Sequence, residues 1–477
     1  MKRTAPLLLS LLACGCTVGP DYHRPAVEKP PSYRGTVTPQ AAQPQAAAEA
    51  AAQPQAAAAT PSFGEEKWWQ VFQDPQLQEL MRIALENNFD VRIAATRILQ
   101  AQAVLGITRA DQLPTLDAGA NAFTARVPKT KLSPEFETNV NEVGAFLAWD
   151  LDFWGKYRRA TEAARANLLG SEWAQRAVIN TLVSDLAAAY FQLRAYDLQL
   201  EISLRTLAAR RESLHLTQSL ADGGAGTLLD VRQAEQLVET AAETIPDLER
   251  QIEQQENYIS TLLGRNPGPI ARGMPLVDQP HLPQVAAGIP STLLERRPDI
   301  REAEAQLMAA NALIGVARAE YFPQISLTGS AGYLSQAASD LFKGPANFWS
   351  LGGSLTQSIF AGGRIRSNVH LSEARQKEML LTYQRTIQQA FRGVSDSLIG
   401  YQKRREFRER QQALVEAARG AAQLSEMRYR GGSTGFLEVL TNETNAFNAE
   451  LGLAQAQLNE LVSLVEIYRN LGGGWES

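Results

Sequence analysis

Apolar and polar residues alternate along four segments of the chain, and this pattern predicts four β-strands. In the segment 143–153 every odd-numbered position is apolar, while Asp150 and Asp152 fall on the opposite face. The segment 325–333 alternates in the same way, with serine, threonine and glycine on its polar face. About ten residues with one apolar and one polar face suit a tilted membrane strand, but also an antiparallel sheet with one wet face. Weaker versions of the pattern occupy residues 115–126 and 348–360.

Two very long stretches without proline follow the predicted strand pairs. Residues 156–221 contain no proline and one glycine, Gly170, and residues 364–430 again contain no proline. Both stretches consist mostly of Ala, Leu, Gln, Glu and Arg, which are good helix formers. With a rise of about 1.5 Å per residue, each helix could reach roughly 100 Å, which is too long for an element of a globular domain. The sequence therefore predicts a coiled coil or a tube.

The body of the chain contains an internal repeat at an offset of about 208 residues. We therefore divide the body into a first repeat, 63–270, and a second repeat with the C-terminal segment, 271–477. Each repeat is expected to contain a helix, two strands, a long helix, a glycine turn and a helix. Three landmarks recur in the same order: Leu113-Pro114 as Phe322-Pro323, residues 153–156 as 361–364, and residues 223–231 as 431–439.

The residues before the body predict an export signal, an anchor and a tether. Residues 1–15 place Lys2 and Arg3 before a short apolar run, which is typical of a secretory signal peptide. Two cysteines at the end of this signal are candidates for acylation. The leucines before Cys14 are better placed for a lipoprotein signal, whereas Cys16 has the better small residue directly before the cleavage site. Residues 16–62 are then the lipid anchor and an Ala/Pro/Gln-rich tether that cannot build a core.

The geometry of the strands predicts the oligomer. Four strands cannot close a barrel, and an open sheet edge cannot face lipid because its N–H and C=O groups would stay unpaired. Two copies would supply eight strands, whose interior is filled by side chains, whereas three copies would supply twelve and leave a passage. We therefore expect a homotrimer with Asp150 and Asp152 in the barrel lumen, where they would favour cations. No later apolar stretch reaches the roughly 18 residues of a membrane-spanning helix.

The composition excludes several classes of function. A net charge of -5 argues against nucleic-acid binding. The chain has 2 Cys, both near the N-terminus, and 4 His without ligand spacing, so we expect no metal site and no cofactor. No nucleophile elbow or phosphate-binding loop is present, and we expect no enzymatic activity.

These residues resemble the TolC-like outer membrane efflux proteins, in particular the lipoprotein branch that works with resistance-nodulation-division pumps. The resemblance is carried by Cys16–Pro25, by Trp68-Trp69 through Leu77, and by Glu295–Ile300. It implies a mainly α-helical chain whose trimer forms a twelve-stranded outer membrane barrel above a periplasmic helical tunnel. It also implies Cys16 as the acylated residue, a periplasmic adaptor at the tunnel tip, and an inner membrane pump that loads drugs or other small molecules.

A glycine pair follows each long helix, and with the strands at the opposite end these pairs must lie at the far tip. Glycine suits the positive-φ residue that ends a helix. The resemblance implies that these tips surround the pore entrance and contact the adaptor. The two pairs are Gly223-Gly224 and Gly431-Gly432.

The resemblance also implies a periplasmic gate at these tips. Tyr429 matches the gating tyrosine of the family and Asp230 matches its partner, so we expect Tyr429 to donate a hydrogen bond to Asp230 in the closed state. Glu438 matches the first of two acidic ring positions, but the second is Thr441, which weakens any acidic constriction. Alternatively, these are solvated charges at a helix end. Two arginines that could pair with the acids flank the site: Arg428 and Arg430.

Two other functions fit part of the pattern. A type I secretion-like channel for protein export would share the strands and helices, but the lipoprotein motif favours small-molecule efflux. An envelope scaffold lipoprotein built from coiled coils would explain the helices and the anchor, but not the paired strands at duplicate positions.

Overall fold

The computed structural model describes residues 17–34, 62–129, 134–280, 288 and 290–475. These residues form two compact units, each built from segments that are far apart in the sequence. The first unit takes in the described parts of Met1–Val27, Thr96–Glu172 and Glu302–Arg385. The second takes in those of Glu28–Ala95, Trp173–Arg301 and Thr386–Ser477. The signal peptide predicted at 1–15, both candidate lipidation residues, Cys14 and Cys16, and most of the predicted tether lie outside the described residues.

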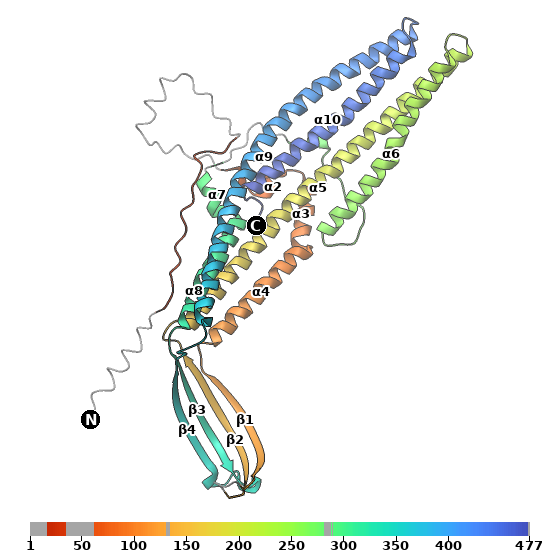
Figure 1. Ribbon diagram of the computed structural model, residues 1–477. Helices are drawn as coiled ribbons and strands as arrows, with labels where there is room; N and C mark the ends of the chain where they lie inside the picture. Colours follow the sequence, from red (N-terminus) through yellow and green to blue (C-terminus); the bar gives the residue numbers. More distant parts are fainter. Residues whose placement is uncertain (1–16, 35–61, 130–133, 281–287, 289, 476–477) are drawn as a thin grey trace, which may run out of the picture. The chain divides into compact units, whose positions relative to one another are not determined.

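Four antiparallel strands form one sheet in the first unit, in the order β1-β2-β3-β4 (Figure 1). The predicted four-stranded, mainly helical fold is therefore confirmed. The prediction of a strand over 143–153 was partly wrong: β2 starts seven residues earlier and ends at Leu151, because the chain turns at Gly155 (φ 81°) to enter the next helix. The strands are β1 (Thr115–Val127), β2 (Phe136–Leu151), β3 (Gln324–Ser335) and β4 (Asn347–Thr356).

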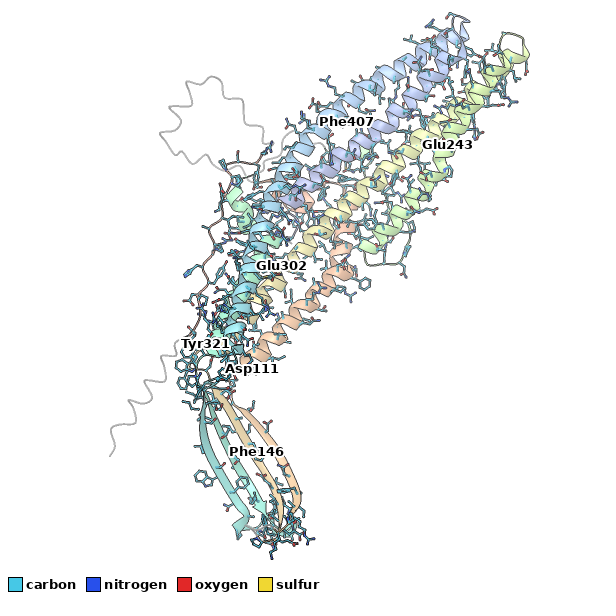
Figure 2. The ribbon with its side chains drawn as sticks, viewed as in Figure 1. Asp111, Phe146, Glu243, Glu302, Tyr321 and Phe407 are labelled. Atoms are coloured by element: carbon cyan, nitrogen blue, oxygen red, sulfur yellow. The ribbon has the colours of Figure 1, made fainter. Side chains whose placement is uncertain are left out.

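The strand register gives the sheet one polar and one apolar face. Residues that oppose each other across a strand pair project from the same face. Asp150 opposes Ser326, which opposes Ser354, whereas Trp149 opposes Leu327. Phe146 of β2, labelled in Figure 2, is an apolar residue on the polar face. Its ring lies where a side chain on Gly119 of β1 would project. The register thus assembles the two faces that the alternation predicted.

Helices of equal length occupy corresponding places in the two halves of the chain. The two longest have 67 residues each, the helices that follow them have 35 each, and those that precede the strands have 22 each. Equal lengths in the same order support the internal repeat (Figure 1). The helices are α4 (Phe89–Ala110) and α8 (Pro298–Ala319), α5 (Lys156–Asp222) and α9 (Arg364–Arg430), and α6 (Leu228–Leu262) and α10 (Phe436–Asn470).

Shorter elements complete the two units, and in the second unit a buried carboxylate connects segments that are far apart in the sequence. Asp74 is fully buried, caps α3 (Pro75–Asn87), and accepts hydrogen bonds from the Tyr190 hydroxyl (2.9 Å) and the Gln279 side-chain amide (3.1 Å). Burying a charge is tolerated only when it is hydrogen-bonded in this way. The remaining elements are α2 (Trp68–Val71), α7 (Pro290–Arg296) and short 3-10 turns. Among the described residues, no helix has both the length and the apolar character needed to cross a bilayer.

Candidate functional site: the helix tips and the strand–helix junction

Both long helices end in the same backbone motif. The Ala225 amide donates to the Leu220 carbonyl at 2.8 Å, and the Ser433 amide donates to the Arg428 carbonyl at 2.9 Å. This bond, from the residue after the left-handed position, is the Schellman termination of a helix. The positive φ belongs to the second glycine of each predicted pair, Gly224 (76°) and Gly432 (66°). Gly223 and Gly431, predicted with them, precede these positions and do not have a positive φ.

Asp230 forms part of the N-terminal cap of its own helix, α6. Its carboxylate accepts hydrogen bonds from the Thr227 amide (2.9 Å) and hydroxyl (2.8 Å), while the Thr227 hydroxyl oxygen accepts from the Asp230 amide (3.2 Å). This reciprocal capping box satisfies helix N–H groups that would otherwise be unpaired. The predicted gate partner of Tyr429 is therefore engaged by its own helix cap in this structure.

Tyr429 packs inward without bonding to Asp230. Its ring lies 5.2 Å from that of Phe436 and joins a buried cluster of α6 and α10. Burial raises the pKa of the Tyr429 hydroxyl; Thr217 opposes this shift and the charge of Asp230 adds to it. The predicted Tyr429–Asp230 hydrogen bond is absent from the described residues, so the gating role stays a prediction.

The second repeat carries an ion pair at the corresponding place. The Arg428 guanidinium donates to Glu438 at 2.7 Å, and the Thr434 hydroxyl donates to the same carboxylate. The other flanking arginine, Arg430, pairs with Glu426 at 2.5 Å. Thr441 is exposed and donates to the Leu437 carbonyl (2.9 Å), so it contributes no charge.

A buried arginine near the tips was missed by the sequence reasoning. Arg210 of α5 donates to the Leu237 carbonyl at 2.8 Å and lies 5.0 Å from the Phe447 ring centroid. Its Nε atom is 4.0 Å from Glu443 of α10, and neither Nε nor Nη2 has a hydrogen-bond partner among the described residues. Burial lowers the pKa of Arg210 and raises that of Glu443. In the sequence this arginine looks like any solvated charge on a long helix.

The predicted lumen aspartates lie where β2 leads into α5. Asp150 accepts hydrogen bonds from the side chains of Ser326 (2.5 Å), Tyr157 (2.9 Å) and Gln324 (3.0 Å). Asp152, just beyond the strand, accepts from the Arg158 amide (2.8 Å). Both aspartates are thus held by donors rather than free in solvent.

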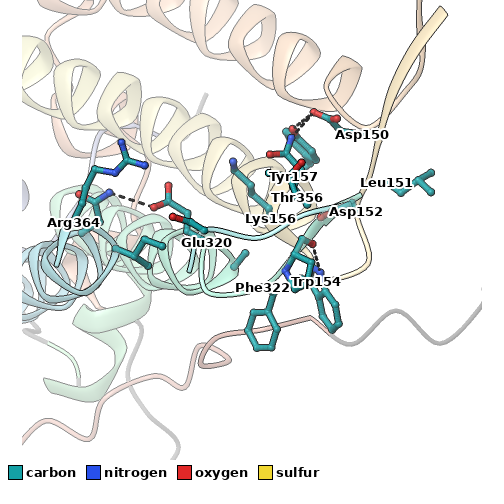
Figure 3. A pocket seen from close by; sticks show the side chains of 16 residues that line it. Asp150, Leu151, Asp152, Trp154, Lys156, Tyr157, Glu320, Phe322, Thr356 and Arg364 are labelled. Carbon is teal, nitrogen blue, oxygen red and sulfur yellow. Dashed lines mark hydrogen bonds between the residues drawn. The ribbon is translucent and has the colours of Figure 1, made fainter. Parts of the chain in front are cut away.

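A cavity of about 510 Å³ opens beside these aspartates in the first unit (Figure 3). The first residues of α5 and α9, Lys156 and Arg364, line it together with Glu320 and the stacked ring of Phe322. The sequence aligned Lys156 with Arg364 as repeat landmarks, but nothing in it indicated that they share a cavity.

The segment that follows Cys16 is held against the helices of the first unit. The Val18 amide donates to the Trp154 carbonyl at 3.0 Å. Arg159, which is 5% exposed, pairs with Asp21 at 2.7 Å, and Arg24 pairs with Glu304 at 2.9 Å. The motif that carried the resemblance is therefore a docked segment. Among the described residues, no group of His, Cys, Asp and Glu could hold a metal ion.

Comparisons with known proteins agree on one family. The family model described as outer membrane efflux protein matches residues 80–265 and 289–473. The solvent efflux pump outer membrane protein SrpC of Pseudomonas putida is 36% identical over 477 residues, covering 99% of this chain and 98% of that protein. The outer membrane protein OprJ of Pseudomonas aeruginosa is also 36% identical, covering 98% of this chain and 95% of that protein.

Solved structures give the same result. The outer membrane channel OprN matches with a TM-score of 0.86 at 32% identity, covering 96% of this chain and all of that chain (100%). The open state of the MtrE outer membrane channel of Neisseria gonorrhoeae matches with a TM-score of 0.83 at 30% identity, covering 97% of this chain and 99% of that chain.

Proposed function

Since the chain belongs to the outer membrane efflux protein family and is the outer membrane channel of an efflux pump, we propose that three copies close into one twelve-stranded pore. The observation that carries this proposal is the sheet itself. It has one polar and one apolar face, and among the described residues its edge strands β1 and β4 each pair on one side only. Such edges are not tolerated in lipid, and neighbouring copies would pair them.

Outer membrane efflux proteins work with a periplasmic adaptor and an inner membrane pump. For this chain we propose an adaptor that contacts the Schellman turns at the helix tips, and a pump of the resistance-nodulation-division type. The proposed adaptor-contact residues are Gly223, Gly224, Gly431 and Gly432.

The proposed cargo is small organic molecules. SrpC is named for solvent efflux, and other relatives that match nearly the whole chain are named for toluene and antibiotic efflux. The chain has no motif of a catalytic site, which supports a passive conduit. Protein export is the competing proposal: deleting the gene should abolish solvent or drug tolerance under the first, and abolish a secreted protein under the second.

We also propose that the mature chain is acylated at Cys16, with Cys14 as the alternative. The segment that is docked on the first unit begins at Thr17, directly after Cys16, and this supports Cys16 as the first residue of the mature chain.

Native mass spectrometry of the protein extracted in mild detergent tests these proposals together. We expect a trimer whose chains start at Cys16 and carry acyl mass. A chain that starts at Cys14 would move the anchor and leave the channel intact. A stable monomer or dimer would contradict the twelve-stranded pore.

A further inference from the structure

The second unit holds long helices side by side: α6, α10, and the parts of α5 and α9 from Trp173 and Thr386 onward (Figure 1). Arg419 of α9 pairs with Glu450 of α10 at 2.5 Å, and Arg205 of α5 pairs with the same carboxyl group at 2.6 Å. Helices α5 and α6 share a buried apolar cluster. These contacts set the order α9, α10, α5, α6, so α9 and α6 are the edges of the row.

Helices α5 and α10 meet in an apolar contact that the internal repeat should provide twice. Ile202 of α5 and Phe447 of α10 are each 5% exposed, and Leu451 packs against the same cluster. The ends of α9 and α10 follow those of α5 and α6 by 208 residues. By this offset the second contact would join α9, in the place of α5, to α6, in the place of α10.

The residues that would form the second contact are charged and exposed. Arg410 of α9 stands in the place of Ile202. On α6 the places of the two apolar residues of α10 are taken by Glu239 and Glu243. None of the three makes an ion pair or a hydrogen bond with a described residue, although the charge of Arg410 acts on Glu406 within α9. A pair of opposite charges thus corresponds to a pair of apolar residues.

The two edge helices carry opposite net charge. Helix α6 has eight acidic and two basic residues, whereas α9 from Thr386 onward has nine basic and five acidic ones. The two arginines of α6 are already paired within the helix, with Glu235 and Asp247. Four glutamates of α6 are exposed, have no such partner among the described residues and lie within a stripe of about 120°, since each residue turns by about 100°. They are Glu239, Glu243, Glu249 and Glu253. This stripe favours a basic partner.

Exposed apolar residues flank Arg410 on α9. Phe407, 58% exposed, precedes it by three residues, and Leu414, 52% exposed, follows it by four, which is the spacing of a coiled-coil seam. Figure 2 labels Phe407 on this edge helix and Glu243 on the other. An apolar seam on the surface of a long helix indicates another helix as its partner.

We propose that α9 of one copy packs against α6 of the next copy as α5 packs against α10 within the chain, with Arg410 between Glu239 and Glu243 of the neighbouring copy. The contact rests on the proposed trimer and adds the register of its helices. Each copy uses its α9 edge once and its α6 edge once, so the contact runs head to tail and closes a ring. Because the contact between copies is charged and the one within the chain is apolar, neither edge suits the wrong partner.

Chemical cross-linking of the full-length protein in mild detergent tests this register. The chain has no cysteine after Cys16, so Arg410→Cys/Glu239→Cys introduces one thiol on each edge. With bismaleimidoethane we expect covalent dimers and trimers on a denaturing gel. In the register control, Arg410→Cys/Glu253→Cys, the second thiol lies about 21 Å further along α6 and should give no such bands. The wild type and each single variant control for the N-terminal cysteines.

A charge swap tests the ion pair by a second route. Arg410→Glu places three carboxylates at each contact between copies, so the trimer should dissociate at a lower temperature in native mass spectrometry. Adding Glu239→Arg/Glu243→Arg to this variant should restore the wild-type dissociation temperature. Circular dichroism should stay unchanged in both variants, because all three side chains are exposed in the single chain.

The outcomes distinguish this contact from the pore. A wild-type trimer whose thiols at positions 410 and 239 do not link different chains would overturn the contact and leave the pore intact. Equal cross-linking of the register control, or no recovery in the charge swap, would also overturn it. A dimer that cross-links would support the contact and contradict the twelve-stranded pore, whereas a wild-type monomer would contradict both.

Discussion

The guanidinium of Arg210 in α5 lies 4.0 Å from the carboxylate of Glu443 in α10, and the arginine side chain is only 1% exposed. This pair joins a helix of the first half of the chain to one of the second, close to the helix ends at Asp222 and Phe436. Removing one charge of such a buried pair is costly, because it leaves the other charge buried and uncompensated.

We predict that Arg210→Met destabilises the folded chain by on the order of 3 kcal/mol at neutral pH. Glu443 would then keep its charge in a mostly buried place without a cation beside it. The double variant Arg210→Met/Glu443→Leu should recover most of this loss, because an apolar pair replaces both charges. Thermal unfolding followed by circular dichroism measures the effect. Arg232→Met, which breaks an exposed pair with Glu235, is the control and should change little.

The loss of folding stability in Arg210→Met should also depend on pH. Burial raises the pKa of Glu443; Arg210 opposes this shift, and Glu426, itself paired with Arg430, adds to it. A carboxyl group whose folded-state pKa is raised costs stability above that pKa, and the cost vanishes below its ordinary value of 4.5. Without Arg210 the pKa rises further, so the destabilisation should shrink as the pH falls from 7 toward 4.5. A loss that stays constant over this range would contradict an uncompensated Glu443.

Asp74→Asn should prevent stable folding of the second unit. The Asp74 carboxylate accepts hydrogen bonds from the Met274 amide (2.9 Å) and the Tyr190 hydroxyl. An asparagine side chain has only one acceptor oxygen, so at least one of these donors would face an NH2 group instead. Each buried donor left unpaired costs about 1–3 kcal/mol. Proteolysis of the purified protein measures the loss of folded material. Asp90→Asn is the control, because the Asp90 carboxyl is exposed at the start of α4. This variant should remain as resistant to proteolysis as the wild type.

Local patterns predicted the elements well, because helix and strand periods depend on neighbouring residues. The helix expected over 156–221 extends over Lys156–Asp222, since no proline interrupts it. The first seven residues of β2 escaped prediction: Phe136–Glu142 contain two glutamates and two asparagines, which conceal the alternation.

The candidate site was harder to predict because it depends on contacts between distant segments. Arg210 and Arg211 are neighbours of the same type, yet the first is buried and the second exposed, since the helix turns by about 100° from one to the next. Asp230 looked like a gate residue by resemblance, but its nearest donor is Thr227, three residues away.

The two glycines of the second tip should differ in their tolerance of a side chain. Gly432 has φ 66°, so Gly432→Ala should destabilise the turn by about 1 kcal/mol. Gly431 does not have a positive φ, and an added Cβ would meet the Met427 carbonyl oxygen at 3.4 Å, an ordinary contact. Hydrogen exchange of the Ser433 amide, which closes the turn, measures the effect. Equal exchange in both variants would mean that the left-handed residue does not stabilise the tip.

The last prediction separates the two roles of Asp230. If Tyr429 donates to it in the closed pore, Tyr429→Phe/Asp230→Ala removes a bond of about 1.5–3 kcal/mol from each protomer, and the single-channel open probability should rise. Thr227→Ala is the control, since it breaks the capping box of α6 without touching Tyr429. It should weaken the start of α6 and leave the conductance unchanged. If the double variant conducts like the wild type, the role of Asp230 is confined to its helix cap, and the closure of the tip must depend on other contacts, such as the Arg428–Glu438 pair.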